Sequence, residues 1–190
     1  CLVGSEMCIR DSEYCDFLSW STGEEEREQY VKALLLEIES YREFAKGYRV
    51  STVFIGGGTP SVLLPEQMER ILQKIYEVFE LEKRPEITIE VNPGTVDEKK
   101  LQCYKENGIN RLSMGLQSVN DEKLRLLGRI HPYRDFVESY ELARKVGFDN
   151  ISLDLISSIP GQNLQEWKKE LETAAAQNPE HISVYQLLEI

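Results

Sequence analysis

The sequence predicts an α/β fold built on a parallel β-sheet, and three observations support this prediction. From residue 24 onward, helix-like segments alternate with short strand-like segments. The strand-like segments are rich in β-branched residues, whereas the helix-like segments repeat apolar residues at spacings of three and four. Two of the helix-like segments end at a glycine, which is common at helix C-termini. This alternation is typical of repeated βα units, whose strands pair in parallel.

The predicted helices follow in order along the chain. We expect five, over residues 24–46, 65–80, 96–108, 133–147 and 164–177. The first has an apolar stripe at helical spacing, formed by Tyr30, Leu34, Ile38 and Tyr41. The second begins at Pro65, and proline is well tolerated in the first turn of a helix.

The predicted strands lie between these helices. We expect five, over residues 50–58, 86–94, 109–117, 150–161 and 181–190. The first helix has no strand before it, and the last strand has no helix after it. A parallel sheet or barrel without its first strand has an open edge. We therefore expect this chain to be a fragment of a longer protein.

Composition and charge exclude several classes of function. With 190 residues, 41% hydrophobic and 29% charged, the chain resembles an ordinary globular domain. A net charge of −11 without any Lys/Arg run argues against a nucleic-acid-binding surface. No apolar stretch is long enough to cross a bilayer, and no segment resembles a secretory signal.

The cysteine pattern indicates a reducing compartment. Cys1, Cys8 and Cys15 crowd near the amino end, and Cys103 stands alone in a helical segment. A disulfide framework would distribute its cysteines more evenly. We therefore expect a cytoplasmic protein.

Polar and glycine residues recur where the predicted strands end. In parallel α/β folds, ligands bind beyond the carboxyl ends of the strands. The residues at these ends are Gly56–Pro60, Glu90 with Asn92–Gly94, Gln117 with Ser118, Asp154, and Tyr185 with Gln186. Glycine lets a ligand approach the backbone closely. The sequence therefore predicts a binding rim at this edge.

Structural explanations compete with this interpretation. A glycine run after a strand is more often a tight turn than a ligand cradle, and alternation alone could turn Glu90 toward solvent. Asp154 lies in an apolar run, where a buried carboxylate needs a partner. Arg129 and His131 follow a short helix, where surface-loop residues are the ordinary expectation. Cys103, on its predicted helix, fits a core-filling role, and Trp167 fits a packing role.

Longer motifs resemble one protein family. TVFIGGGTPS, EITIEVNPGT, GINRLSMGLQSVND, LGRIH, ARKVGFDNISLDLI, PGQ and HISVYQL occur in this order. Their order and spacing resemble the radical S-adenosylmethionine (SAM) proteins related to oxygen-independent coproporphyrinogen III oxidase. The resemblance covers about residues 12 to 190. It implies a partial (β/α)6 barrel, here lacking its first strand.

The resemblance also implies a 4Fe–4S cluster and bound SAM. The family holds its cluster with the motif C-x-x-x-C-x-Y/F-C, and here Cys8, Ser12 and Cys15 occupy the three ligand places. In this family SAM binds the iron that the cysteines leave open. A serine hydroxyl is a poor substitute for a thiolate on iron. As written, the ligand loop would be damaged.

The residues before position 13 resemble a translated sequencing adapter. LVGSEMCIRDS matches one frame of a transposon-based adapter that ends two bases into codon 12. The third base that makes serine there would also complete a cysteine codon. We therefore expect residues 1–12 to be non-native, residue 12 to be cysteine in the natural protein, and Cys8 to match its place by coincidence. Residues 13–190 would then be an incomplete radical SAM core domain whose C-terminal domain is absent.

The family's residue roles transfer by position. Tyr14 would lie against SAM, and the backbone of Gly57, Gly58 and Thr59 would meet its methionine end. Glu90 would accept a hydrogen bond from a ribose hydroxyl or an amine. The positions that contact a second SAM in the oxidase correspond to Gln117, Arg129 and Asp154. The sequence departs from the family at Ser158, where a glycine is usual, so we expect an altered loop there.

Three functions stay open. The residues YCDF, ending at Asp16 and Phe17, are typical of the haem-chaperone branch, which binds haem and delivers it to acceptor proteins. The oxidase branch instead decarboxylates a porphyrinogen with a 5′-deoxyadenosyl radical, after an electron donor reduces the cluster. Without the resemblance, the glycine turn could bind a phosphorylated ligand, although GGGTP lacks the Lys/Ser pair of a P-loop. The protein is an enzyme if it belongs to the oxidase branch, and a haem-delivery protein if it belongs to the chaperone branch.

Overall fold

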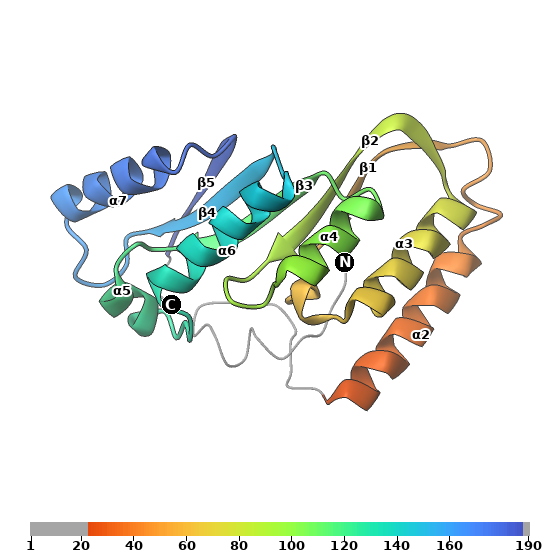
Figure 1. Cartoon of the computed structure of the whole chain (residues 1–190), viewed down its shortest axis with the longest axis horizontal. Helices are drawn as coiled ribbons and strands as arrows, with labels where there is room; N and C mark the ends of the chain where they lie inside the picture. The colour runs from red at the N-terminus through yellow and green to blue at the C-terminus, as the bar shows by residue number, and fades with distance from the viewer. Residues whose placement is uncertain (1–22, 188–190) are drawn as a thin grey trace.

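The computed structural model describes residues 23–187 and confirms the parallel sheet. Its five strands are β1 (Arg49–Ile55), β2 (Glu80–Val91), β3 (Arg111–Gln117), β4 (Ile151–Ser157) and β5 (His181–Gln186). Their order in the sheet is β1-β2-β3-β4-β5, and every neighbouring pair is parallel. With the helices, they form a half-barrel of the α/β class (Figure 1).

Helices connect the strands and lie along one side of the sheet, as Figure 1 shows for α3, α4 and α6. They are α2 (Glu24–Ser40), α3 (Pro65–Val78), α4 (Glu98–Glu106), α5 (Asp121–Leu126), α6 (Tyr133–Val146) and α7 (Leu164–Ala176), with a short 3₁₀ turn η1 (Pro60–Val62). The five predicted helices correspond to α2, α3, α4, α6 and α7. Among residues 23–187, no helix has both the length and the apolar character needed to span a membrane.

Several predicted boundaries are wrong, and two of them differ most from the structure. Helix α2 ends at Ser40 rather than near residue 46, because the chain turns from Tyr41 and passes Gly47 in the left-handed region. Strand β2 begins at Glu80 rather than residue 86, since its first residues already pair with Arg49 and Val50. The pairing then skips Glu82–Pro85, and proline cannot donate a ladder hydrogen bond.

The core lies between the helices and one face of the sheet. Residues Ile87, Ile89 and Val91 of β2 are buried in it, together with Met68 of α3 and Leu101 of α4. Because side chains alternate along a strand, the residues between them face the opposite, helix-free side. This alternation places Glu90 and Asn92 on the side that carries the polar groups.

Side-chain caps fix where the connecting helices begin. The Asp97 carboxylate accepts from the Lys100 amide at 2.8 Å at the start of α4. At the start of α7, Asn163 Oδ1 accepts from the Glu166 amide, and the Glu166 carboxylate accepts from the Asn163 amide, both at 3.0 Å. Such caps satisfy amides that have no partner within the helix. They determine where each loop leaves the sheet edge.

The core predicts a large contrast between two leucine substitutions. Leu112 in β3 is 0% exposed, whereas Leu36 on α2 is 74% exposed. We expect Leu112→Ala to lower the free energy of unfolding by about 2–5 kcal/mol because it leaves a cavity. Leu36→Ala should change it by no more than about 0.5 kcal/mol. Urea unfolding of both variants measures the difference, and equal losses would contradict this packing.

Candidate functional site

The carboxyl ends of the strands meet at one edge, as parallel pairing requires. Ile55 pairs with Ile89, and Val91 pairs with Met114. Gly115 pairs with Asp154 on β4. The loops that follow β1, β2 and β3 are therefore neighbours, and their polar side chains contact one another. This edge is the candidate site.

The glycine loop after β1 closes on a carboxylate from β2. The Gly57 amide donates to Glu90 Oε2 at 2.9 Å. A Cβ at Gly56 would lie 2.6 Å from the Glu90 carboxyl carbon, so Glu90 packs against bare backbone. Gly57 has a φ of 103°, which favours glycine. The loop therefore turns tightly after β1, and the negative charge beside its amide argues against a phosphate cradle.

Asn92 joins the glycine loop to Arg129. Asn92 Nδ2 donates to Thr59 Oγ1 at 2.9 Å, and Arg129 Nη2 donates to Asn92 Oδ1, also at 2.9 Å. Arg129 Nη2 also lies 3.4 Å from the Gly115 carbonyl oxygen, which it can reach only at the limit of a hydrogen bond. The sequence placed Asn92 at the predicted rim but assigned it no role in binding. Its signal is the strand alternation that places it on the same face as Glu90.

The expectation that Arg129 and His131 are surface-loop residues is wrong. Arg129 is 7% exposed and His131 is 4% exposed. They are buried because the segment after α5 folds back against the sheet edge, where Arg129 contacts Asn92. Within residues 23–187, Arg129 Nε and both His131 ring nitrogens have no hydrogen-bond partner. Burial, together with the nearby Arg129 charge, lowers the pKa of His131 to about 3.

Gln117 lies at a strained end of β3. Its φ is 63°, in the left-handed region, and the pairing with β4 is irregular between Gly115 and Gln117. A Cβ on Gly115 would come within 2.8 Å of Gln117 Nε2, so the Gln117 side chain folds over this glycine. Gln117 is thereby brought beside the Asn92–Arg129 contact.

A buried carboxyl on α7 supports the end of β3. Ser118 Oγ donates to Glu170 Oε1 at 2.9 Å, and both residues are buried. Burial raises the pKa of Glu170, while the hydrogen bond from Ser118 opposes that shift. Gln162 accepts from the Ser158 amide at 2.9 Å. Glu170 is a residue that sequence reasoning missed, because nothing local marks one glutamate of an amphipathic helix as buried.

Asp154 lies one strand further along the same face. Its Oδ2 accepts from Ser113 Oγ at 2.9 Å, which supplies the partner that a carboxylate in an apolar strand needs. Burial raises the pKa of Asp154, and hydrogen bonds from Ser113 and Ser183 oppose the shift. In the described part of the chain, Asp154 is joined to this serine pair rather than to the Asn92–Arg129 contact.

The structure also describes four other residues that the sequence singled out. Ser158 has a φ of 64°, which explains why glycine is usual there: this serine adopts a conformation that favours glycine. Trp167 packs against the core, as predicted. Cys103 is only partly buried, and its thiol lies 3.5 Å from the Pro65 carbonyl oxygen. Tyr185, predicted at the rim, is exposed.

Lys100 forms hydrogen bonds to both the loop after β1 and the loop after β2. Its Nζ donates to the Ser61 carbonyl at 2.7 Å and to the Thr95 carbonyl at 2.9 Å. Burial lowers the pKa of Lys100. The Ser61 and Thr95 hydroxyl oxygens are themselves 2.6 Å apart. Hydrogen bonds that involve both side chains and backbone carbonyls thus connect the loops after β1 and β2.

The expected cluster loop lies outside the described residues. Tyr14, Cys8, Ser12 and Cys15 all precede residue 23, so their predicted roles stay predictions. Among residues 23–187, no group of three or more His, Cys, Asp or Glu side chains is arranged to hold a metal ion.

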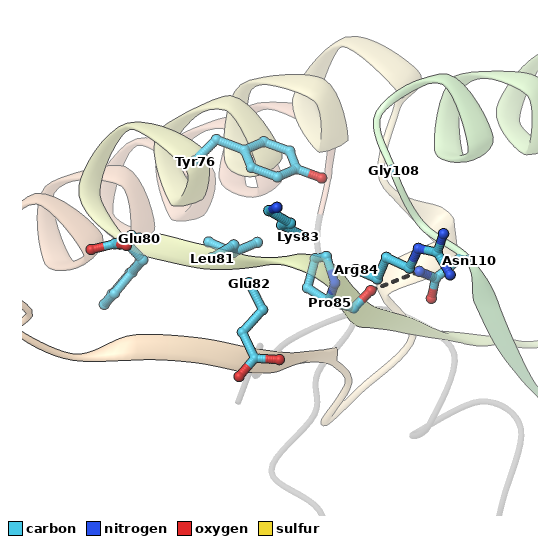
Figure 2. A pocket seen from close by; sticks show the side chains of 10 residues that line it. Tyr76, Glu80, Leu81, Glu82, Lys83, Arg84, Pro85, Gly108 and Asn110 are labelled. Carbon is cyan, nitrogen blue, oxygen red and sulfur yellow. Dashed lines mark hydrogen bonds between the residues drawn. The ribbon is translucent and has the colours of Figure 1, made fainter.

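A surface groove lies at the opposite ends of the strands. Figure 2 shows Leu81, Lys83, Arg84 and Pro85 around it, with Tyr76 above. The Asn110 side chain donates to the Pro85 carbonyl at 2.8 Å, across the unpaired segment of β2. The groove follows from that irregular pairing and shares no residue with the candidate site.

Comparisons with known proteins agree with this geometry. A family model described as the radical SAM superfamily matches residues 2–174. The haem chaperone HemW of Escherichia coli is 40% identical over 181 residues, covering 95% of this chain and 48% of the relative. HemW of Bacillus subtilis is 38% identical over 184 residues, with the same two coverages. The chain thus spans about half the length of the curated relatives it matches.

A solved structure extends the likeness to the fold. Coproporphyrinogen III oxidase from Escherichia coli, described as a radical SAM enzyme, superposes with a TM-score of 0.88 at 31% identity. The match covers 99% of this chain and 44% of the oxidase chain. A structure titled native anSMEcpe with bound AdoMet superposes with a TM-score of 0.66 at 14% identity, which supports the fold alone.

The lowered pKa of His131 predicts a defined pH dependence. Below about pH 6.5 the unfolded chain binds a proton at this histidine, whereas the folded chain resists protonation until about pH 3. Folding stability is therefore lost as pH falls through this window, by up to about 1.4 kcal/mol per pH unit, and is fully present above it. In His131→Leu this loss should be absent.

Urea unfolding between pH 7.5 and 4.5 measures it, as the difference between the wild-type chain and His131→Leu at each pH. The carboxylates titrate equally in both proteins, so they cancel in this difference. His181→Gln is the control, since it alters the other of the two histidines and leaves His131 in place, so its difference from His131→Leu should still depend on pH. A difference that stays constant with pH would contradict the burial of a neutral His131.

Proposed function

Because the chain belongs to the radical SAM superfamily, we propose that the intact protein binds haem and delivers it to acceptor proteins, with SAM and a 4Fe–4S cluster as cofactors. Family membership implies the two cofactors. The observation that supports the chaperone function most strongly is the 40% identity to HemW over 95% of this chain. The residues YCDF, ending at Phe17, support the same branch.

Two features of the candidate site support its assignment to SAM. Gly56 and Gly115 are buried and leave no room for a Cβ, so the side chains of Glu90 and Gln117 pack directly on their backbone at this edge. We assign the methionine end of SAM to the backbone of Gly57, Gly58 and Thr59. Glu90 would accept from a ribose hydroxyl or an amine, because a carboxylate is an acceptor only.

The remaining predicted residues would serve a second ligand. Arg129 carries a buried positive charge, and Gln117 offers an amide beside it. We propose that these two residues, with Asp154 further along the edge, contact a second SAM or another ligand with a carboxylate. Within that assignment they bind and orient, and no bond is made or broken by them.

The donor set for the cluster does not fit in this chain. Cys8 and Cys15 supply thiolates, but Ser12 supplies a hydroxyl, which is a poor iron ligand. We propose that residues 1–12 are not native, that position 12 is naturally cysteine, and that the native protein continues beyond residues 13–190. A ligand loop of free thiols also favours a reducing compartment such as the cytoplasm.

Restoring the cysteine tests the cluster proposal. We expect Ser12→Cys to raise the iron and sulfide retained after anaerobic reconstitution, because a thiolate replaces a hydroxyl on iron. Low-temperature EPR after reduction should show a cubane signal that SAM perturbs. Ser51→Cys is the control, since it adds a cysteine far from the motif. Equal loading of Ser12→Cys and the unchanged chain would contradict the assigned ligand place.

The oxidase function is the alternative, and the TM-score of 0.88 to coproporphyrinogen III oxidase favours it. The complete protein with a native ligand loop distinguishes the two. We expect haem to bind with a saturable change in its Soret absorbance and to move to an apo-haem protein such as apomyoglobin. We expect no decarboxylation of coproporphyrinogen III under reducing conditions with SAM. Turnover of that substrate, without haem transfer, would establish the oxidase function instead.

A further inference from the structure

Arg129 is a buried cation that forms no ion pair with any acidic side chain of residues 23–187. It is 7% exposed, and its guanidinium donates to Asn92 Oδ1 at 2.9 Å. Its second acceptor is the Gly115 carbonyl at 3.4 Å. Throughout residues 23–187, none of the ion pairs involves Arg129, and its Nε has no hydrogen-bond partner. Both acceptors around this charge are therefore neutral.

Such an arrangement is costly in the absence of a ligand. A buried charge is ordinarily paired, because desolvation is repaid only by an opposite charge or by full hydrogen bonding. The guanidinium matches a carboxylate in shape and can bind it through two parallel hydrogen bonds. A carboxylate on the ligand would complete the contacts that the protein leaves unmade.

The residue type at position 92 decides whether that charge is available. The amide of Asn92 uses both ends, donating to Thr59 Oγ1 and accepting from Arg129, each at 2.9 Å. Aspartate has the same size and could accept from both partners, since the threonine hydroxyl can donate instead. It would also form an ion pair with Arg129 and cancel its charge.

We propose that Asn92 is a positioning residue that holds Arg129 toward the ligand while leaving its charge for a carboxylate of that ligand. This deepens the proposed function and rests on its assumption that a ligand binds at this edge. Gly115 contributes to the same arrangement. A Cβ there would lie 3.2 Å from Asn92 Oδ1 and 3.3 Å from Arg129 Nη2, so the absence of a side chain keeps the contact open.

The test compares Asn92→Asp with Asn92→Ala in the 190-residue chain without a cluster, so that iron does not compete for carboxylates. The probes form two matched pairs. SAM is compared with decarboxylated SAM, and haem is compared with its dimethyl ester, which lacks free propionates. Dissociation constants come from calorimetry for the first pair and absorbance titration for the second. Thermal unfolding reports the stability of each variant.

We expect Asn92→Asp to weaken binding of a carboxylate-bearing probe by at least about tenfold, the typical weight of a charge-assisted hydrogen bond. The matched probe without carboxylate should bind within about twofold of wild type, and the unfolding temperature should stay equal or rise. Asn92→Ala should lower both stability and affinity. If only SAM and decarboxylated SAM differ in their response to Asn92→Asp, the carboxylate is that of SAM. If only haem and its dimethyl ester differ, the carboxylate is that of a tetrapyrrole.

Opposite results would overturn the proposal. If Asn92→Asp binds the carboxylate probes as the wild type does, Arg129 does not serve them. If it weakens both members of a pair equally, Asn92 has only a structural role. The proposal is also refuted if the wild-type chain binds the carboxylate-bearing probes no more tightly than the matched probes without a carboxylate. None of these binding measurements needs an electron donor or a haem acceptor. The haem-transfer experiment on the complete protein can therefore fail or succeed independently of this test.

Discussion

Parallel pairing of consecutive strands is the constraint on which the candidate site depends. Each pairing from β1 to β5 places one carboxyl end beside the next, and side chains at neighbouring ends can then reach one another. The Gly57–Glu90 and Thr59–Asn92 contacts both join the ends of β1 and β2. A slip of one residue in that register would turn Glu90 and Asn92 into the apolar core.

Local sequence patterns predicted the parts of the structure that are set locally. Alternation of strands and helices gave the parallel sheet, and glycines after β1 predicted a turn. Non-local packing explains what the sequence did not reveal. Arg129 and His131 look like loop residues until the segment after α5 folds onto the sheet edge. The start of β2 depends on pairing with Arg49, which no pattern within β2 indicates.

The same distinction applies to the site residues. Glu90 and Gln117 stand out because a polar side chain ends an apolar strand, and the structure brings both to the shared edge. Asn92 was placed at the rim but given no role, because an asparagine before Pro93 and Gly94 also fits an ordinary turn. Glu170 is recognised only from its contact with Ser118, 52 residues earlier in the chain. Burial shifts the pKa of Glu170, Asp154 and His131 toward their neutral forms, which leaves the guanidinium of Arg129 as a fixed charge among them.

The sequential strand order also has a consequence for how the protein is made. Each strand lies beside the strand that is synthesised before it. Each new βα unit can therefore pair with the edge of the sheet already formed as it leaves the ribosome. The Thr59–Asn92 contact spans 33 residues and the Asn92–Arg129 contact spans 37. Closing loops of this length costs little more entropy than closing much shorter ones. The edge would therefore assemble in order during translation, and the contacts from Thr59 through Asn92 to Arg129 would be complete once the segment after α5 has emerged.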